Sequence, residues 1–171
     1  MSKVFSKKKI IYSRSGFTLV ELIIYMGLLA MLVLIFTEIF TSVVDNQLSS
    51  SNTSNVSGDG RYIYSRFVYD VARAQSITDP SAFASPSSTM TLLINGENYT
   101  YQLTSGNLSI EAPSGTFQLN SQGTTISNLE FTKVGSASAR STVQLNFTVT
   151  GDVDTRGIFD QKDFQTTAGL R

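Results

Sequence analysis

The chain divides into three zones by its pattern of apolar and polar residues. Residues 1–16 are polar and basic, residues 17–44 are almost continuously apolar, and the rest is rich in Ser, Thr, Asn and Gly. About 20 apolar residues in a helix cover the hydrocarbon core of a bilayer. Phe17 to Phe36 has this length, with Glu21 as its single charge. We therefore predict that residues 17–44 form a membrane-spanning helix.

The polar zone begins with a segment of Ser, Asn and Gly, residues that favour turns over helix interiors. We predict that residues 45–60 break the helix. A helical pattern then returns, because Ile63, Phe67 and Val71 recur at a spacing of four. This stripe predicts an amphipathic helix over residues 61–78. The charged residues on its other side are expected in solvent: Arg66, Asp70 and Arg73.

Strand patterns occupy about residues 89–150. Asn95-Gly96 and Ser105-Gly106 are tight-turn signals between alternating segments. Residues 143–149 are apolar at every odd position and polar at every even one, which is typical of a strand with one buried face. We predict an antiparallel meander covered by the helix of residues 61–78, followed by a C-terminal tail. The fold class is then α+β, a long N-terminal helix with a transmembrane half and an amphipathic half that packs on the sheet.

The charges are unevenly distributed, although 13 Lys and Arg balance 13 Asp and Glu. Five basic residues precede residue 17, and without them eight remain against 13 acidic residues, a net charge of −5. A basic tip fits the cytoplasmic side of a membrane anchor. Nucleic-acid binding needs a clustered positive face, so the acidic body disfavours a nucleic acid as partner.

The sequence contains no Cys, His or Trp. Thiolate and imidazole metal sites and the usual nucleophile–base pairs are therefore excluded. We expect no catalytic residue and no cofactor. Asp152 to Asp163 matches several positions of a calcium loop, but Arg156 stands where a ligand belongs. A solvated loop is the preferred interpretation of this segment.

The border between the basic and apolar zones reads Ser15-Gly16-Phe17-Thr18-Leu19-Val20-Glu21. This segment closely resembles the type IV prepilin signature, and its surroundings fit: a short basic leader before it, an apolar helix after it, and a β-rich C-terminal part. The resemblance implies that a prepilin peptidase cuts between Gly16 and Phe17 and methylates the new amino group of Phe17. It also implies that Glu21 serves assembly, by pairing with the N-terminal amine of a neighbouring subunit. An ionisable group inside an apolar span is costly and needs such a partner.

The resemblance sets the expected function, location and partners. The soluble part is similar, more loosely, to the larger minor pilins and pseudopilins of the J/PilW kind, so we expect a structural subunit of a type IV pilus, pseudopilus or competence-type filament. Its expected partners are other pilin or pseudopilin subunits, the prepilin peptidase, an inner-membrane assembly platform and membrane lipid. The chain would cross the cell membrane once, with a cytoplasmic N-terminus, before joining an extracellular or periplasmic filament. The alternative is a membrane-anchored binding module that keeps residues 1–16.

Overall fold

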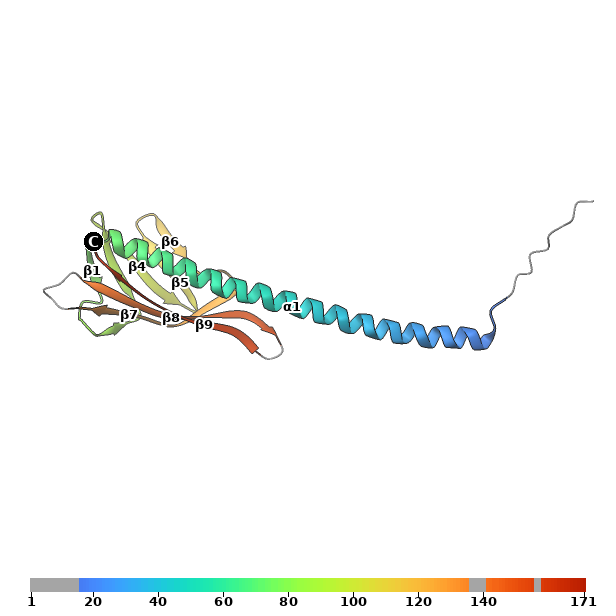
Figure 1. Cartoon of the computed structure of the whole chain (residues 1–171). Coiled ribbons are helices and arrows are strands. Elements are labelled where there is room, and N and C mark those ends of the chain that lie inside the picture. The colour runs from blue at the N-terminus through green and yellow to red at the C-terminus, as the bar shows by residue number, and fades with distance from the viewer. Residues whose placement is uncertain (1–15, 136–140, 156–157) are drawn as a thin grey trace, which may run out of the picture. The chain divides into compact units, whose positions relative to one another are not determined.

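The computed structural model describes residues 16–135, 141–155 and 158–171. Residues 1–15, which hold almost all of the expected leader, lie outside this range. The chain forms two compact units that divide between Val43 and Val44. Within the described residues one long helix precedes nine strands. Their bounds are α1 (Leu19–Arg73), β1 (Ser76–Asp79), β2 (Pro86–Ser87), β3 (Met90–Ile94), β4 (Glu97–Thr104), β5 (Asn107–Ala112), β6 (Gly115–Gln118), β7 (Thr124–Val134), β8 (Thr142–Thr155) and β9 (Ile158–Gly169), and Figure 1 shows the helix leading into the strands.

The strands form two antiparallel sheets, and with helix α1 packed on them they confirm the α+β, pilin-like fold class. The first sheet has the order β1-β3-β4-β5-β6, and the second has the order β2-β7-β8-β9. We predicted a single meander. Strands β3 to β6 follow one another with short turns, and β7 to β9 follow one another in the second sheet. Strand β2, however, lies between β1 and β3 in the chain and pairs with β7, so the chain enters the second sheet before the first is complete. Alternation along a strand shows which face is buried and not which sheet the strand joins.

Both predicted tight turns are present between paired strands. Asn95 and Gly96 have φ angles of 54° and 82°, and Ser105 and Gly106 have 50° and 81°. Two successive positive φ angles match the right-handed twist of the flanking strands, and Asn and Gly adopt them most readily. The predicted buried face over residues 143–149 is also confirmed, because its four odd positions are buried: Val143, Leu145, Phe147 and Val149. Of the even positions, Thr148 is buried as well.

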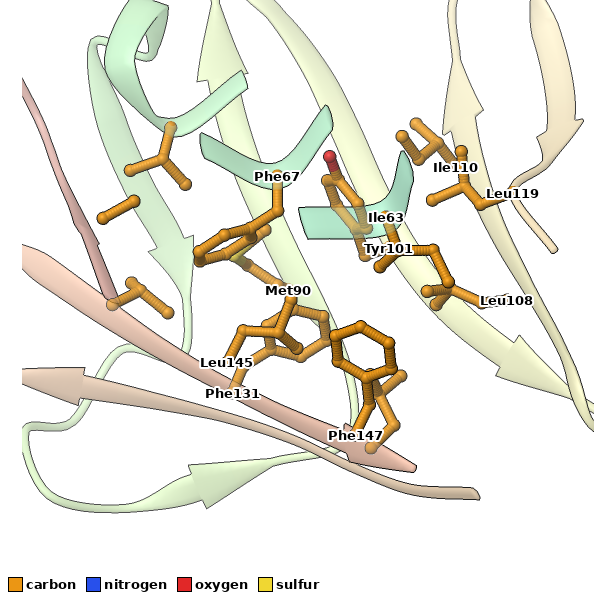
Figure 2. Close-up of a cluster of buried hydrophobic side chains, with 14 of the residues drawn as sticks. Ile63, Phe67, Met90, Tyr101, Leu108, Ile110, Leu119, Phe131, Leu145 and Phe147 are labelled. Carbon is orange, nitrogen blue, oxygen red and sulfur yellow. The ribbon is translucent and has the colours of Figure 1, made fainter. Parts of the chain in front are cut away.

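The hydrophobic core lies between the C-terminal part of α1 and the two sheets. The predicted stripe of Ile63, Phe67 and Val71 is fully buried. Phe67 lies 6.3 Å from Phe131 of β7, measured between ring centroids, and Phe131 lies 6.0 Å from Tyr101 of β4. Figure 2 shows these rings among the buried side chains. One aromatic cluster therefore joins the helix, the first sheet and the second sheet.

The predicted break at residues 45–60 is wrong, because α1 runs through this segment without interruption. The buried stripe extends N-terminally through Asn52, Val56 and Gly60, so tertiary contacts hold the segment in a helix despite its composition. A Cβ atom at Gly60 would lie 2.0 Å from Cζ of Phe164, and one at Gly151 would lie 1.9 Å from Oδ1 of Asn52. The two glycines therefore allow the helix to approach β8 and β9 closely.

Two further predicted boundaries are wrong. The helix ends at Arg73 and not at residue 78, and Ile77 is buried in β1, where it pairs with Leu92. The expected C-terminal tail is instead β9, which pairs with β8 over most of its length. Phe164 of this strand stacks on Phe147 with 5.2 Å between ring centroids. An apolar residue that ends a helical stripe equally fits an edge strand, so periodicity alone could not place Ile77.

Candidate functional site

The Gly16–Phe17 peptide immediately precedes helix α1. Both residues are exposed and have no regular secondary structure. Apart from its two chain neighbours, a Cβ atom added at Gly16 would meet no atom of the described residues within 4 Å, so the described surroundings of this peptide bond are open. A protease needs a substrate segment that is accessible and not locked in a helix. The junction predicted for cleavage has both properties.

Thr18 caps the start of the helix and fixes the position of Glu21. The backbone N–H of Glu21 donates to Thr18 Oγ1 at 3.2 Å, and the backbone N–H of Leu22 donates to the Thr18 carbonyl at 3.1 Å. Thr18 with an acidic residue three positions later is the sequence pattern of a capping box. The structure thus places the Glu21 carboxylate in the first turn of the helix, where the helix dipole favours negative charge.

Tyr25 joins this site, although the sequence interpretation did not single it out. Its hydroxyl donates to Glu21 Oε1 at 3.2 Å, and its ring meets the ring of Phe17 edge-on with centroids 5.9 Å apart. Phe17, Glu21 and Tyr25 are spaced by four residues and share one face of the chain. This spacing of four was the signal in the sequence that could have identified Tyr25, since residues four apart on a helix are neighbours. The hydroxyl gives the carboxylate a hydrogen-bond donor within an apolar segment.

The apolar segment presents its side chains outward. From Gly16 to Val43 every residue is exposed except Glu21, which is half-buried. Helix α1 is long and apolar enough to cross a membrane by length and composition. An apolar surface of this extent marks contact with lipid or with other protein. This segment supports the interpretation of the chain as membrane-anchored.

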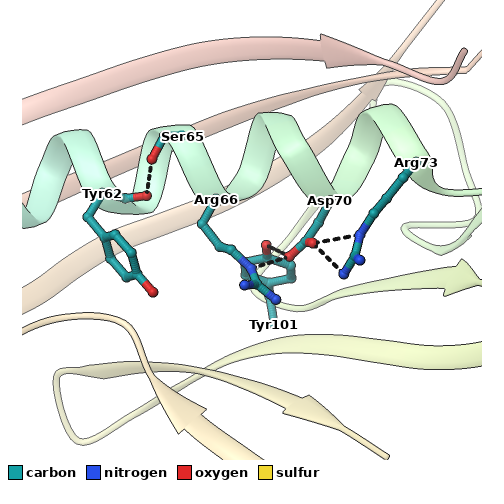
Figure 3. Close-up of polar contacts among 6 residues, drawn as sticks. All are labelled: Tyr62, Ser65, Arg66, Asp70, Arg73 and Tyr101. Carbon is teal, nitrogen blue, oxygen red and sulfur yellow. Dashed lines mark hydrogen bonds and ion pairs between the residues drawn. The ribbon is translucent and has the colours of Figure 1, made fainter.

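The second compact unit, Val44–Arg171, which we call the soluble unit, contains a second polar cluster. This cluster corrects the prediction that Asp70 is solvated. Asp70 is fully buried. Its Oδ2 accepts hydrogen bonds from Arg66 Nε and the Tyr101 hydroxyl, both at 2.8 Å, and its Oδ1 lies 2.9 Å from Arg73 Nη2 (Figure 3). About a third of each arginine side chain stays exposed, so the prediction that Arg66 and Arg73 lie in solvent is partly confirmed. A buried carboxylate is tolerated when it is paired and hydrogen-bonded in this way.

The cluster changes the acid–base properties of its members. Burial and, next, the negative charge of Asp70 raise the pKa of Tyr101 well above its ordinary value. Partial burial by itself lowers the pKa of Arg66, but the hydrogen bond and charge of Asp70 outweigh this and raise that pKa. Tyr101 therefore stays neutral and donates a hydrogen bond to Asp70, while the guanidinium group of Arg66 stays charged.

The calcium-like segment forms part of the β8–β9 hairpin. Asp163, its last position, lies in β9 opposite Thr148, and the Thr148 hydroxyl donates to Asp163 Oδ1 at 2.7 Å. Arg156 lies outside the described residues. Among the residues described, no group of three or more acidic side chains is placed to hold a metal ion. The described residues of this segment therefore lie in two paired strands, where the sequence interpretation expected a loop.

Comparison with known proteins bears on the first of these sites. Residues 12–37 match the family model of the prokaryotic N-terminal methylation motif. No curated protein and no solved structure matches the chain. The matched range includes the Gly16–Phe17 junction, the Thr18 cap, Glu21 and Tyr25. Residues 12–37 therefore carry the prokaryotic N-terminal methylation motif, the signature of type IV pilins.

Proposed function

We propose that the chain is a minor structural subunit of a type IV pilus, a secretion pseudopilus or a competence-type filament. In this proposal a prepilin peptidase first removes residues 1–16 and methylates the amino group of Phe17. The observation that supports it best is the position of the Gly16–Phe17 peptide within the matched motif. This peptide is exposed, unhindered at Gly16 and directly followed by a capped helix. A peptidase can therefore cut it without unfolding α1.

The apolar segment supports the two stages that follow cleavage. Its outward side chains can be covered by lipid while the chain waits in the membrane, with the basic residues 1–16 on the cytoplasmic side. In the filament the corresponding segments of neighbouring subunits replace the lipid. An inner-membrane assembly platform would move the chain from the lipid bilayer into the filament. The carboxylate of Glu21 then pairs with the Phe17 amine of a neighbour, because an apolar interior favours charges that are matched.

The chain itself performs no reaction in this proposal. Gly16 and Phe17 are substrate positions of another enzyme, and Glu21 acts in assembly. The partners are other pilin or pseudopilin subunits, the peptidase, the platform and lipid.

Intact-mass analysis of protein from its native cell tests the proposal. The mass should show that residues 1–16 are missing and that one methyl group is present on Phe17. A Gly16→Val variant is the matched control, since a Cβ atom at this position meets no atom of the described residues beyond its chain neighbours, while the branched side chain crowds the scissile peptide. We expect this variant to keep its leader. Filament-associated protein that still carries Met1 to Gly16 would contradict the proposal and favour an uncleaved anchored module.

A further inference from the structure

A groove beside the Asp70 cluster combines two arginines with aromatic rings. It has a volume of about 310 Å³ and lies between α1 and strands β4 to β6. Ligand sites in proteins have volumes of about 300–1,000 Å³, and they typically combine aromatic walls with a few converging polar groups. We call it the arginine groove, and the lining residues used here are Tyr62, Arg66, Arg73, Tyr99, Ser114 and Phe117. Figure 3 shows that Tyr62, Arg66 and Arg73 point from α1 to the same side.

The two arginines of the groove are held in place by their own chain. The fully buried carboxylate of Asp70 accepts hydrogen bonds from Nε of Arg66 at 2.8 Å and from Nε of Arg73 at 3.1 Å. The Arg73 guanidinium also lies 4.7 Å from the ring centroid of Tyr69 and 5.4 Å from that of Tyr99. About a third of each arginine side chain stays exposed. An ordered and partly exposed guanidinium group loses little side-chain entropy when it binds a ligand.

The charges of the groove favour an anionic ligand. Arg66 and Arg73 share the single negative charge of Asp70, so the three side chains together carry one excess positive charge. Glu97 lies on the same side of the first sheet as Tyr99, because side chains two residues apart on a strand share a face. It does not line the groove, and it forms no ion pair with an arginine that the structure describes. Planar guanidinium groups suit a carboxylate in particular.

The rings of the groove favour an aromatic body on that anion. Tyr62 of α1 is 51% exposed and Phe117 of β6 is 53% exposed, and Tyr99 of β4 adds a third, half-buried ring. Aromatic rings pack on one another edge-on or offset, and guanidinium groups stack on aromatic faces. A ligand with a ring would therefore remove apolar surface from water at the same place where the arginines bind its charge.

We propose that the arginine groove binds a carboxylate that carries an aromatic ring. Arg66 and Arg73 bind the carboxylate. The ring packs among Tyr62, Tyr99 and Phe117. A free aromatic acid has this chemistry, and so does a polypeptide whose last residue is aromatic. The site lies in the soluble unit and goes beyond the proposed filament function, so it depends neither on leader removal nor on assembly. If the arginines served only to pair Asp70, neither the charge nor the ring of a ligand would affect binding.

Titration of the isotope-labelled full chain in detergent micelles, followed by the NMR signals of its backbone amides, tests the site. Phenylacetate is the probe, phenylacetamide has the same shape without the charge, and acetate has the charge without the ring. We expect phenylacetate to shift the signals of residues 112–117, and the two other compounds to bind about tenfold more weakly, as for the loss of a hydrogen bond to a charged group. Partition of a probe into the micelle is the same for every variant, so differences between variants report the groove.

Two pairs of variants separate the contributions of charge and ring. Ser114→Glu places a carboxylate in the groove and should weaken phenylacetate binding about tenfold, whereas Ser127→Glu, at an exposed position on β7, should leave it unchanged. Phe117→Thr removes an exposed ring of the groove and should weaken binding about two- to tenfold. Phe159→Thr is its matched control, because Phe159 is also 53% exposed and lies on β9. Glu97→Gln should not weaken binding, since Glu97 does not line the groove.

N-acetyl-L-phenylalanine, which resembles the end of a polypeptide, distinguishes the two sources of the ligand. Binding at least as tight as that of phenylacetate would support the site and assign it to a chain end, and binding about tenfold weaker would assign it to a free acid. Equal affinities for phenylacetate and phenylacetamide would overturn the proposal, as would signal shifts confined to residues outside the groove. Equal effects of Ser114→Glu and Ser127→Glu would overturn it as well. The spectrum of each variant shows directly whether that variant is folded.

Discussion

At the scale of residues, Asp70 and Tyr101 show how a charged position can be buried in the fold. Asp70 has no exposed surface and is bound by Arg66 and Arg73 of its own helix and by Tyr101 of β4. The tyrosine lies 31 residues away in the sequence. A helical pattern alone places Asp70 on the charged side of the helix, and only the position of β4 shows that this side is covered.

The hydroxyl of Tyr101 should make the stability of the soluble unit depend on alkaline pH. In the unfolded chain Tyr101 loses its proton near pH 10. In the folded chain the raised pKa keeps the proton on. Above pH 10 the unfolded state thus binds fewer protons than the folded state, so stability falls as pH rises toward the folded pKa. Tyr101→Phe should lower the free energy of unfolding by about 1.5–3 kcal/mol at pH 7, as expected for the loss of a hydrogen bond to a charged group. Between pH 7 and pH 11 this variant should lose less stability than the natural protein, because it has no hydroxyl to ionise at this position.

Urea unfolding of a soluble fragment beginning at Gln47, at pH 7 and pH 11, measures this difference. Tyr69→Phe is the control, because Tyr69 is 59% exposed and its ring contact with Arg73 survives the change. The prediction is contradicted if the natural fragment and Tyr101→Phe lose the same free energy of unfolding between the two pH values.

At the scale of elements, the C-terminal part of α1 is kept helical by its packing on the sheets and not by the helix propensity of its residues. Residues 45–60 are poor helix formers, yet they are helical because Asn52, Val56 and Gly60 are buried against the sheets. The Thr53 hydroxyl also donates to the Ser49 carbonyl at 3.1 Å, so the polar side chains bond within the helix. The element is therefore one helix whose second part depends on the strands that it covers.

Phe67 should be one of the main contributors to this packing. It is fully buried and contacts Phe131 across the core. Phe67→Ala in the fragment beginning at Gln47 should lower the free energy of unfolding by about 3–5 kcal/mol, because it removes apolar contacts and leaves a cavity. Tyr64→Ala, an aromatic truncation on the same helix at a position that is 47% exposed, should change it by no more than about 0.5 kcal/mol. Similar losses in the two variants would show that the helix packs by another face.

At the scale of the whole molecule, the chain combines an apolar segment whose side chains are exposed with a soluble unit that has its own core. The structure of the apolar segment does not follow from that of the soluble unit, nor the reverse. The soluble unit buries its apolar side chains without help from residues 16–43, so the apolar segment needs lipid or other chains for cover. This combination is what the proposed function requires, a subunit that is stored in a membrane and then used in an assembly.

Glu21 should matter for assembly and not for insertion into the membrane. Glu21→Gln keeps the shape of the side chain and removes its charge, so insertion should be unchanged or easier and cleavage at Gly16 should continue. Recovery with filaments should fall about tenfold, equivalent to about 1.4 kcal/mol, because the variant cannot pair with the Phe17 amine of a neighbour. Glu38→Gln removes the other carboxylate of the apolar segment and is the matched control.

Co-purification of each variant with filaments, together with intact mass, provides the measurement. Recovery of Glu21→Gln at the natural level, with normal processing, would show that the carboxylate is incidental. An equal loss for Glu38→Gln would assign the effect to charge in the segment as a whole.

The local physics of the sequence is sufficient to predict several features of this protein. The run from Phe17 to Phe36 is long and apolar enough to predict a membrane helix, and alternation over residues 143–149 predicts a strand with one buried face. Asn95-Gly96 predicts its turn because few residue pairs adopt two positive φ angles. The segment around Gly16 and Phe17 suffices to identify the N-terminal methylation motif, because that motif is a short continuous stretch of chain.

Tertiary structure decided the features that depend on contacts between distant residues. Gly60 faces Phe164, and this close approach keeps a Ser- and Asn-rich segment helical where composition predicts a break. Ile77 is a strand residue because the edge of β3 is free to pair with it. Asp70 is buried because Tyr101 reaches it from β4. In each case the competing local preferences differ by about 1 kcal/mol or less per residue, so packing between elements far apart in the sequence determines the outcome.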